Sequence, residues 1–370
     1  MITQQPYQSS SFGVRNAGED IDHEPIIIVF YLVPDFTMLA FSSAVEVLRL
    51  ANRVLGYEAY RWRVASASGG AVQAICGLSA VTNSSISTER RRLFEECRPS
   101  MVVICADQDV ESYSSKSLEA WLRECRHCGV AVSGVGTATY ILAKAGLLND
   151  KYCTIHWEKL PGFSERYMEV PVAAVIYQVD GNIWTCAGGS ASLDMMLHLV
   201  QRHFGDETVA GICEQAIVER VRAPNERQRL PLLQKHGISN QIMIKLIEQM
   251  EHHLAEPLSI EKLAKSVKRS RRQVERLFRR ELGRSPLSYY RELRLERARM
   301  LLTQSAIPIV DIAIACGFIS ASHFSKSFRE TYGMAPHEVR KGRVTSKQLF
   351  LDIPVNESTV NYPQAIDLAC

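Results

Sequence analysis

The stretch IEKLAKSVKRSRRQVERLFRRELGRSP (260–286) decides the fold of the carboxyl-terminal part, because it returns 50 positions later as VDIAIACGFISASHFSKSFRETYGMAP (310–336). Core, capping and turn positions correspond between the copies: Phe278 with Phe328, Ser270 with Ser320, and Gly283 with Gly333. Two matched basic helices in one short domain suit two neighbouring segments of the DNA major groove. The repeat therefore predicts two helix-turn-helix units, at about 260–281 and 310–331.

The second helix of each unit carries the side chains expected to face DNA. In the first unit Ser270 is a favourable N-cap, and the apolar residues that follow recur at helical spacing, which turns one face inward. The opposite faces predict these DNA-contacting residues: Arg271, Arg272, Arg276 and Arg279 in the first unit, and Ser322, His323, Lys326 and Arg329 in the second. Arginine can donate two hydrogen bonds to guanine, whereas Ala321 and Ser322 are short. We therefore expect stronger base reading by the first unit.

A single basic helix is usually a solvated surface, so the distribution of charge along the chain matters as well. The net charge is only +3, but residues 222–343 hold 24 Lys and Arg against 12 Asp and Glu, a net +12. Such a difference between two parts of a chain indicates that one part contacts a polyanion. Charge attracts phosphate without sequence preference, so specificity is left to the recognition helices.

The stretch GFISASHFSKSFRETYGMAPHEVRK (317–341) resembles the carboxyl-terminal signature of the AraC family of transcription regulators. The resemblance covers about 240–342. It implies that the exposed residues of the helices at 270–281 and 320–331 contact bases and phosphates. It also implies that double-stranded DNA, RNA polymerase and a second copy of the chain, in a homodimer, are partners.

The preceding part of the chain alternates strand-like and helix-like segments. PIIIVFYLV (25–33) is a continuous apolar run, typical of a strand buried on both faces. FTMLAFSSAVEVLRLANRVLG (36–56) follows with helical spacing and a glycine stop. Further strand candidates are RWRVASAS (61–68), MVVICAD (101–107), VAVSGVG (130–136), VAAVIYQVD (172–180) and NIWTCAG (182–188). The alternation predicts an α/β domain with a mostly parallel, flavodoxin-like sheet.

Composition divides the chain into five segments. We expect a disordered arm at 1–23, the α/β domain at 24–221, a linker at 222–240, an all-α DNA-binding domain at 241–342 and a tail at 343–370. No apolar run reaches the roughly 20 residues that cross a bilayer, and no secretory signal pattern is present, so we expect a cytoplasmic protein without membrane contact. The ten cysteines lack zinc-ligand spacing, so we expect reduced thiols and no metal or cofactor.

The stretch VAVSGVGTATYILAKAGLLNDKYCTIHWE (130–158) predicts strand, tight turn, helix and strand, the order in which a nucleophile elbow occurs. It resembles the amidotransferase-like, PfpI-type domain of GlxA-like AraC regulators, over about 26–201. In active members of that fold a cysteine lies at the elbow. The resemblance places this cysteine position on Gly136, its histidine partner on His156 and, by a poor match, the acid on Glu46. Because glycine has no thiol, we expect no catalytic residue.

A pocket at the carboxyl ends of parallel strands is what remains, since α/β sheets usually bind ligands there. We expect it to be lined by Glu46, Gly136, Thr137, Ala138, His156 and Trp157. The backbone amides of 136–138 could hold a carboxylate, and His156 could either contact the ligand or pin its strand. The resemblance is closest to regulators of betaine, carnitine and amino-acid catabolism, which implies a quaternary amine or amino-acid derivative as effector.

These patterns predict a transcription regulator that responds to a small molecule, and we expect an activator. Two alternatives stay open. One is an amidase or peptidase that carries a DNA-binding domain, against which Gly136 argues. The other is an architectural DNA-binding protein without a ligand, which binding of any metabolite would exclude.

Overall fold

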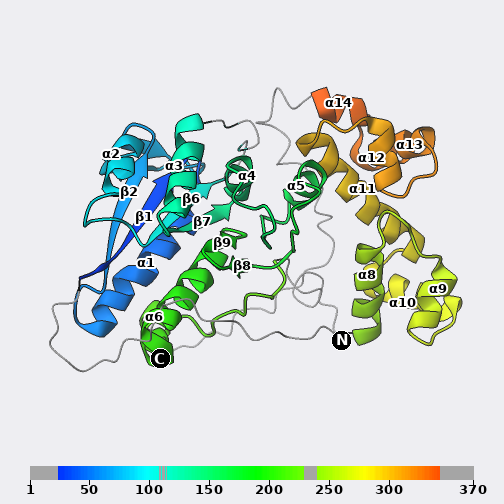
Figure 1. Cartoon of the computed structure of the whole chain (residues 1–370). Coiled ribbons are helices and arrows are strands. Elements are labelled where there is room, and N and C mark those ends of the chain that lie inside the picture. Colours follow the sequence, from blue (N-terminus) through cyan, green and yellow to red (C-terminus); the bar gives the residue numbers. More distant parts are fainter. Residues whose placement is uncertain (1–23, 108–109, 111–112, 114, 229–239, 342–370) are drawn as a thin grey trace, which may run out of the picture.

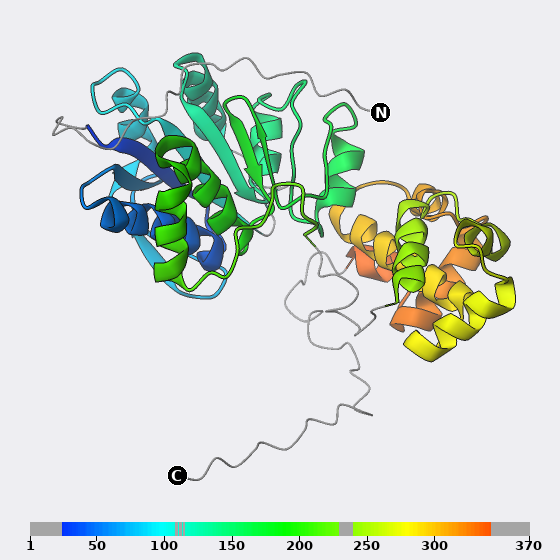
Figure 2. The same cartoon turned by 90° about the horizontal axis from the view of Figure 1, so that it is seen from below.

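The computed structural model describes residues 24–107, 110, 113, 115–228 and 240–341. They form an α/β domain, coloured blue to green, and an all-helical domain, coloured yellow to orange, which lie side by side (Figure 1, Figure 2). The expected arm at 1–23 and the tail at 343–370 lie outside the described residues. None of the described helices combines the length and the apolarity that a membrane span requires.

A seven-stranded sheet in the order β5-β2-β1-β6-β7-β9-β8 forms the centre of the α/β domain. Its strands are β1 (Ile26–Leu32), β2 (Tyr60–Ser66), β5 (Ser84–Ser85), β6 (Met101–Ala106), β7 (Ala131–Gly136), β8 (Tyr177–Asp180) and β9 (Ile183–Cys186). All neighbouring pairs are parallel except β8 with β9, which confirms the predicted mostly parallel sheet. β3 (Gly70–Gln73) and β4 (Ser79–Thr82) pair as a separate antiparallel hairpin.

Helices cover both faces of the sheet, because strand side chains alternate between two cores. Phe30 of β1 joins the core beneath α1 (Met38–Leu55) and α6 (Ala191–Ala216). Tyr31 joins the opposite core, to which these helices contribute: α2 (Ile86–Arg92), α3 (Lys116–His127), α4 (Thr139–Lys144) and α5 (Leu160–Arg166). Residues 28–33 are all buried, so this apolar run has the double burial that the sequence predicts.

The sequence analysis does not predict several short elements. α2, α5 and each strand of the β3–β4 hairpin have seven residues or fewer, too few to show a clear apolar period. α5 also contains Pro161 and Gly162, which usually indicate a loop. In the other direction, the strand predicted at 172–180 is too long, because only Tyr177–Asp180 pairs with β9.

The helical domain has two cores joined by one long helix. Its elements are α8 (Gln241–His252), α9 (Ile260–Ser266), α10 (Arg271–Leu282), α11 (Pro286–Gln304), α12 (Ile309–Ala315), α13 (Ala321–Tyr332) and α14 (Pro336–Lys341). Tyr290 of α11 packs in the first core with Phe278, and Leu301 of α11 packs in the second with Phe328. At 1.5 Å per residue α11 is about 28 Å long, so it separates the two predicted units by a fixed distance.

Candidate functional site

The first recognition helix, α10, begins with a complete capping box. The Ser270 hydroxyl accepts a hydrogen bond from the Gln273 N–H, and the Gln273 side chain accepts one from the Ser270 N–H. Val274 and Phe278 are buried beneath the helix. The cap and this inward face hold the opposite, arginine-rich face of α10 toward solvent.

The four arginines of α10 predicted to contact DNA are all exposed, but they differ in their partners. Arg271 donates to Glu261 of α9 and to Glu275, both at 2.9 Å, and so ties the two helices together. Within the described parts of the chain no carboxylate pairs with the other three, Arg272, Arg276 and Arg279. Arg271 uses its Nε and Nη1 atoms in these ion pairs, so the other three guanidinium groups offer more donors to DNA.

The second recognition helix, α13, has the same framework. The Ser320 hydroxyl accepts a hydrogen bond from the His323 N–H at 3.2 Å, and Phe324 and Phe328 are buried. The predicted DNA-facing residues of this helix are all exposed: Ser322, His323, Lys326 and Arg329.

Arg294 of α11 holds the turn of the second unit. Its guanidinium donates to the carbonyl oxygens of Cys316 and Gly317 at 2.8 and 2.7 Å, and lies 4.1 Å from the centre of the Phe318 ring. Burial lowers the pKa of this guanidinium from its ordinary value. Sequence reasoning missed Arg294 because it lies on another helix, where its spacing suggests only a solvated position.

A basic cleft lies between the start of α8 and α10. Asn240 and Ile242 line one side, and Arg269, Arg276 and Arg280 are among the residues that line the other. Arg269 and Arg280 are absent from the predicted set, although the basic run at 268–272 was a signal for the first. Arg276 borders this cleft as well as the exposed helix face, so its predicted DNA contact is either to a base or to a phosphate.

The predicted elbow lies at the end of β7, where Gly136 has a left-handed φ of 72°. A Cβ atom on Gly136 would lie 2.5 Å from the carbonyl oxygen of Ala106. A Cβ on Gly188 would lie 2.9 Å from the Gly136 Cα, so two glycine backbones pack against each other here. The elbow therefore lacks a nucleophile and has no room for one without movement of the backbone.

Two of the three backbone amides expected to hold a carboxylate donate hydrogen bonds within the fold. The N–H groups of Thr137 and Ala138 donate to the carbonyls of Ala106 and Val135, both at 3.3 Å. Because these donors are already engaged, they do not form the open carboxylate cradle that the sequence suggested.

Asp107 lies beside the elbow and is a polar group that sequence reasoning missed. The Thr137 hydroxyl donates to the Asp107 carbonyl, and the Thr37 hydroxyl donates to the Asp107 carboxylate. Asp107 follows β6 as Gly136 ends β7, and these strands are parallel neighbours. Its position after a buried strand was the available signal.

His156 is brought to the elbow by its backbone. Its N–H donates to the Gly136 carbonyl at 3.4 Å, and its half-exposed ring lies 5.7 Å from the ring of Trp157. The His156 Nδ1 atom is 4.0 Å from a carboxylate oxygen of Glu158. Gly136, Thr137, Ala138, His156 and Trp157 are thus joined by direct contacts or chain continuity.

Glu46 is placed differently. It lies on the exposed side of α1 and pairs with Arg49 at 2.7 Å, one turn along the same helix. This ion pair directs the carboxylate along the helix surface, so we leave Glu46 out of the site.

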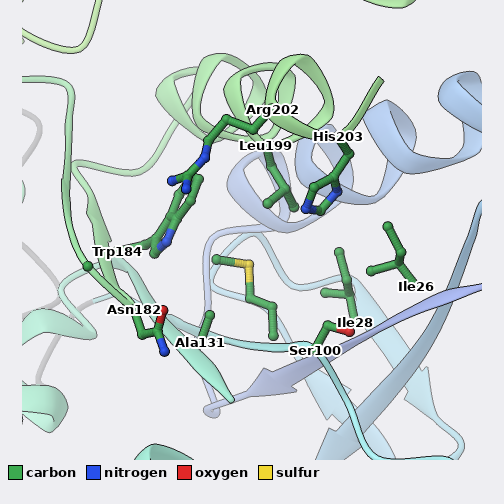
Figure 3. A pocket seen from close by; sticks show the side chains of 11 residues that line it. Ile26, Ile28, Ser100, Ala131, Asn182, Trp184, Leu199, Arg202 and His203 are labelled. Atoms are coloured by element: carbon green, nitrogen blue, oxygen red, sulfur yellow. The ribbon is translucent and has the colours of Figure 1, made fainter. Parts of the chain in front are cut away.

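A cavity lies at the amino ends of the strands, the opposite end of the sheet from the elbow (Figure 3). Its apolar walls come from β1, β6 and α6 and include Ile28, Met101 and Leu199. At the mouth the Arg202 guanidinium lies 5.6 Å from the centre of the Trp184 ring. Trp184 therefore combines a buried position with a cation contact, but far along the strands from the predicted pocket.

The thiols near the sheet are buried and protonated. Burial raises the pKa of Cys153 and of Cys186 to about 12, and raises that of Cys105 further. A thiolate is the reactive form of cysteine, so these side chains are structural. Among the described residues no group of three or more His, Cys, Asp or Glu side chains is placed to hold a metal ion.

Comparison with known proteins covers both domains. Residues 263–342 match the family described as "Helix-turn-helix domain". The HTH-type transcriptional regulator GbdR of Pseudomonas aeruginosa is 35% identical over 348 residues, 94% of this chain and 93% of that protein. The HTH-type transcriptional regulator GlxA of Rhizobium meliloti is 32% identical over 315 residues, 85% of this chain and 95% of that protein.

The solved structure of an AraC family transcriptional regulator from Pseudomonas putida is 26% identical to this chain, with a TM-score of 0.47, over 52% of this chain and all of that one. The GbdR and GlxA matches extend through the α/β domain as well as the helical domain. With its repeated helix-turn-helix units and these full-length relatives, the chain belongs to the AraC family of transcriptional regulators, in the GlxA-like group that carries an α/β domain before the DNA-binding domain.

Proposed function

We propose that this DNA-binding regulator activates transcription when its α/β domain binds a small cationic metabolite, and that the domain catalyses no reaction. The observation that carries the proposal is the elbow, where Gly136 keeps the left-handed backbone of a nucleophile position while Ala106 fills the space of a side chain. An elbow that lacks a nucleophile can still form part of a binding site for a small molecule.

The charge at this edge of the sheet favours a cation. Asp107 and Glu158 supply carboxylates, and Trp157 supplies a partly exposed indole, which attracts quaternary ammonium groups. The Thr137 and Ala138 amides, which could have held an anion, donate to carbonyls of the fold. This chemistry suits a quaternary amine or an amino-acid derivative. We place the protein in the cytoplasm, as a homodimer that acts with RNA polymerase at double-stranded DNA.

A thermal-shift screen of the full-length chain tests the proposal, with glycine betaine, carnitine and the free amino acids as first probes. A ligand present at 100 times its Kd should stabilise the native state by about 2.7 kcal/mol. Trp157→Ala and Asp107→Asn should abolish that shift, whereas His127→Ala, an exposed histidine on α3, should retain it.

His156→Ala separates the two roles left open for this residue. If the ligand-induced shift is lost and the ligand-free Tm is unchanged, His156 contacts the ligand. If the ligand-free Tm is lowered, His156 has a structural role in holding its strand. Turnover of any amide or peptide by the chain, persisting after Cys105→Ala and Cys153→Ala, would contradict the proposal and favour the enzyme alternative.

A further inference from the structure

Two connections between the DNA-binding domain and the α/β domain converge on residues 154–162. The first is made by α5 and the end of α11, which pack side by side (Figure 1). The second is made by residues 227–228, in the segment that we expected to be a linker. The segment 154–162 also contains His156 and Trp157, so both connections reach the proposed effector site.

Gln304, the last residue of α11, makes the first connection. Its Nε2 atom donates to the carbonyl oxygen of Glu158 at 2.5 Å. α5 approaches through Gly162, where a Cβ atom would lie 2.9 Å from the Gln304 Cβ and 3.2 Å from its Oε1. The Cβ of Gln304 is fixed to its helix and cannot swing aside, so this approach requires a residue without a side chain.

Gln228 and Arg227 make the second connection. The Gln228 Nε2 atom donates to the Thr154 hydroxyl at 3.0 Å and to the Ile155 carbonyl at 2.8 Å. The neighbouring Arg227 pairs with Glu248 of α8 at 2.9 Å. The helical domain therefore contacts the α/β domain and the segment that follows it through two helices, α8 and the end of α11.

The segment between these connections is also fixed to the elbow. The His156 N–H donates to the Gly136 carbonyl, and the His156 carbonyl accepts hydrogen bonds from Lys159 and Leu160 at the start of α5. A displacement of His156 must therefore move α5, and with it the surface that Gln304 contacts. All eight predicted DNA-facing residues remain exposed in this docked arrangement, so docking orients the recognition helices without covering them.

We propose that residues 154–162 couple the α/β domain to the DNA-binding domain, with Gly162 and Gln304 as the positioning residues of the contact. The role of His156 in this coupling rests on the proposed effector site, whereas the docking contact does not. Docking presents both recognition helices in one orientation. Loss of the Gly162–Gln304 contact leaves the chain itself and the Arg227–Glu248 ion pair, and exposed ion pairs of this kind contribute little. We therefore expect weaker specific DNA binding when the contact is broken.

Gly162→Ala in the full-length chain tests the contact from the α/β side. The substitution is remote from the recognition helices, so it does not damage them directly. Alanine also favours a helix more than glycine does, so the substitution should not unfold α5. A loss of DNA affinity would therefore report on the contact between α5 and α11. We expect at least about fivefold weaker binding to a duplex selected with the parent chain. The salt dependence should not change, because no phosphate contact is lost. Hydrogen exchange in α5 should become faster.

Ser164→Ala and Thr303→Ala are the matched controls. Ser164 lies on α5 and Thr303 lies next to Gln304, and within the described part of the chain each hydroxyl donates to carbonyls of its own helix alone. Both variants should bind DNA as the parent does, whereas Gln304→Ala should repeat the effect of Gly162→Ala. His156→Ala should alter DNA affinity in the parent and add nothing in Gly162→Ala.

Parent-like DNA binding by Gly162→Ala would overturn the proposal, as would a loss of affinity with unchanged exchange in α5. Additive effects of His156→Ala and Gly162→Ala would overturn the coupling. The effector is tested separately: if no metabolite binds but Gly162→Ala still weakens DNA binding, the docking contact is supported and the effector proposal fails.

Discussion

The first helix-turn-helix unit, α9 with α10, and the second, α12 with α13, place equivalent phenylalanines in their cores but present different side chains to solvent. Phe278 and Phe328 lie 50 positions apart and are both fully buried. On the exposed faces, the first helix shows three arginines for which the described residues provide no carboxylate partner. At the matched positions the second helix has Ser322 and Lys326 in place of the first two arginines and keeps the third as Arg329. The positions that repeat are those that fold the unit, and the positions that differ are those available to distinguish one DNA segment from another.

The two units also differ in how their turns are supported. Arg294 donates to two carbonyls in the turn of the second unit. The position 50 residues earlier is Ile244, which has no donor to offer the first turn. Both turns contain a left-handed residue, Lys268 with a φ of 53° in the first and Gly317 with a φ of 72° in the second. The two units therefore share one turn geometry, which a lysine adopts in the first and a glycine supported by Arg294 adopts in the second.

The largest expected effect tests whether the two cores are equivalent. Phe278→Ala and Phe328→Ala should each lower the unfolding free energy of their unit by about 3–5 kcal/mol, because each leaves a cavity in a closely packed core. Native-state hydrogen exchange of the α10 and α13 amides separates the two units. A loss confined to one variant would show that the repeated sequence does not give equivalent packing.

The second prediction tests the difference in DNA reading at one matched position. Arg276→Ala should weaken binding to the selected duplex by about 1–3 kcal/mol and relax the preference at one base pair. Lys326→Ala should weaken selected and scrambled duplexes alike and reduce the salt slope by about one. Arg291→Ala, an exposed arginine on α11, controls for the loss of charge.

Equal losses for Arg276→Ala on both duplexes would place Arg276 against a phosphate, in the basic cleft that it shares with Arg269 and Arg280. The proposed division of labour between the two units would then be wrong at this position. Titration of both duplexes at several salt concentrations gives the answer.

The smallest expected effect concerns the helix caps. Ser270→Ala and Ser320→Ala should each lower the stability of their unit by about 1 kcal/mol, because each removes an acceptor for an N–H at the start of a recognition helix. Gln273→Ala should lower the stability of the first unit by only a few tenths of a kcal/mol, a smaller effect than that of Ser270→Ala. The second unit has no matching effect to lose, because His323 at the matched position contributes to its cap through its backbone N–H. Hydrogen exchange at the helix starts measures both, and equal effects of Gln273→Ala and Ser270→Ala would contradict this order.

The DNA-binding domain was largely predictable because its signals are local. Serine caps, helical apolar spacing and left-handed glycines act within a few residues of each other, and the repeat presents them twice. The eight predicted DNA-facing residues are exposed in the structure, and their contact with DNA stays a prediction. The sequence did not predict the roles of Arg269, Arg280 and Arg294, because these roles depend on which helix lies beside each residue.

The α/β domain was predictable in its sheet and less so in its site. The alternation of strands and helices predicted that the strands are mostly parallel. The short helix α5 was not predicted, because Pro161 and Gly162 indicate a loop. Glu46 was included on a poor match, and its ion pair with Arg49 turns it along the helix surface. Asp107 was overlooked, although it follows a buried strand.

By itself the sequence determined the class of each domain, the two helix-turn-helix units and the absence of a thiol at Gly136. These depend on the identity and spacing of residues that are close in the chain. Only the tertiary structure decided that Ala106 closes the elbow, that the elbow amides are engaged, and that Gly162 admits Gln304. Each of these is a contact between separate elements, where a few tenths of an ångström decide what fits, and local spacing carries no information about such distances.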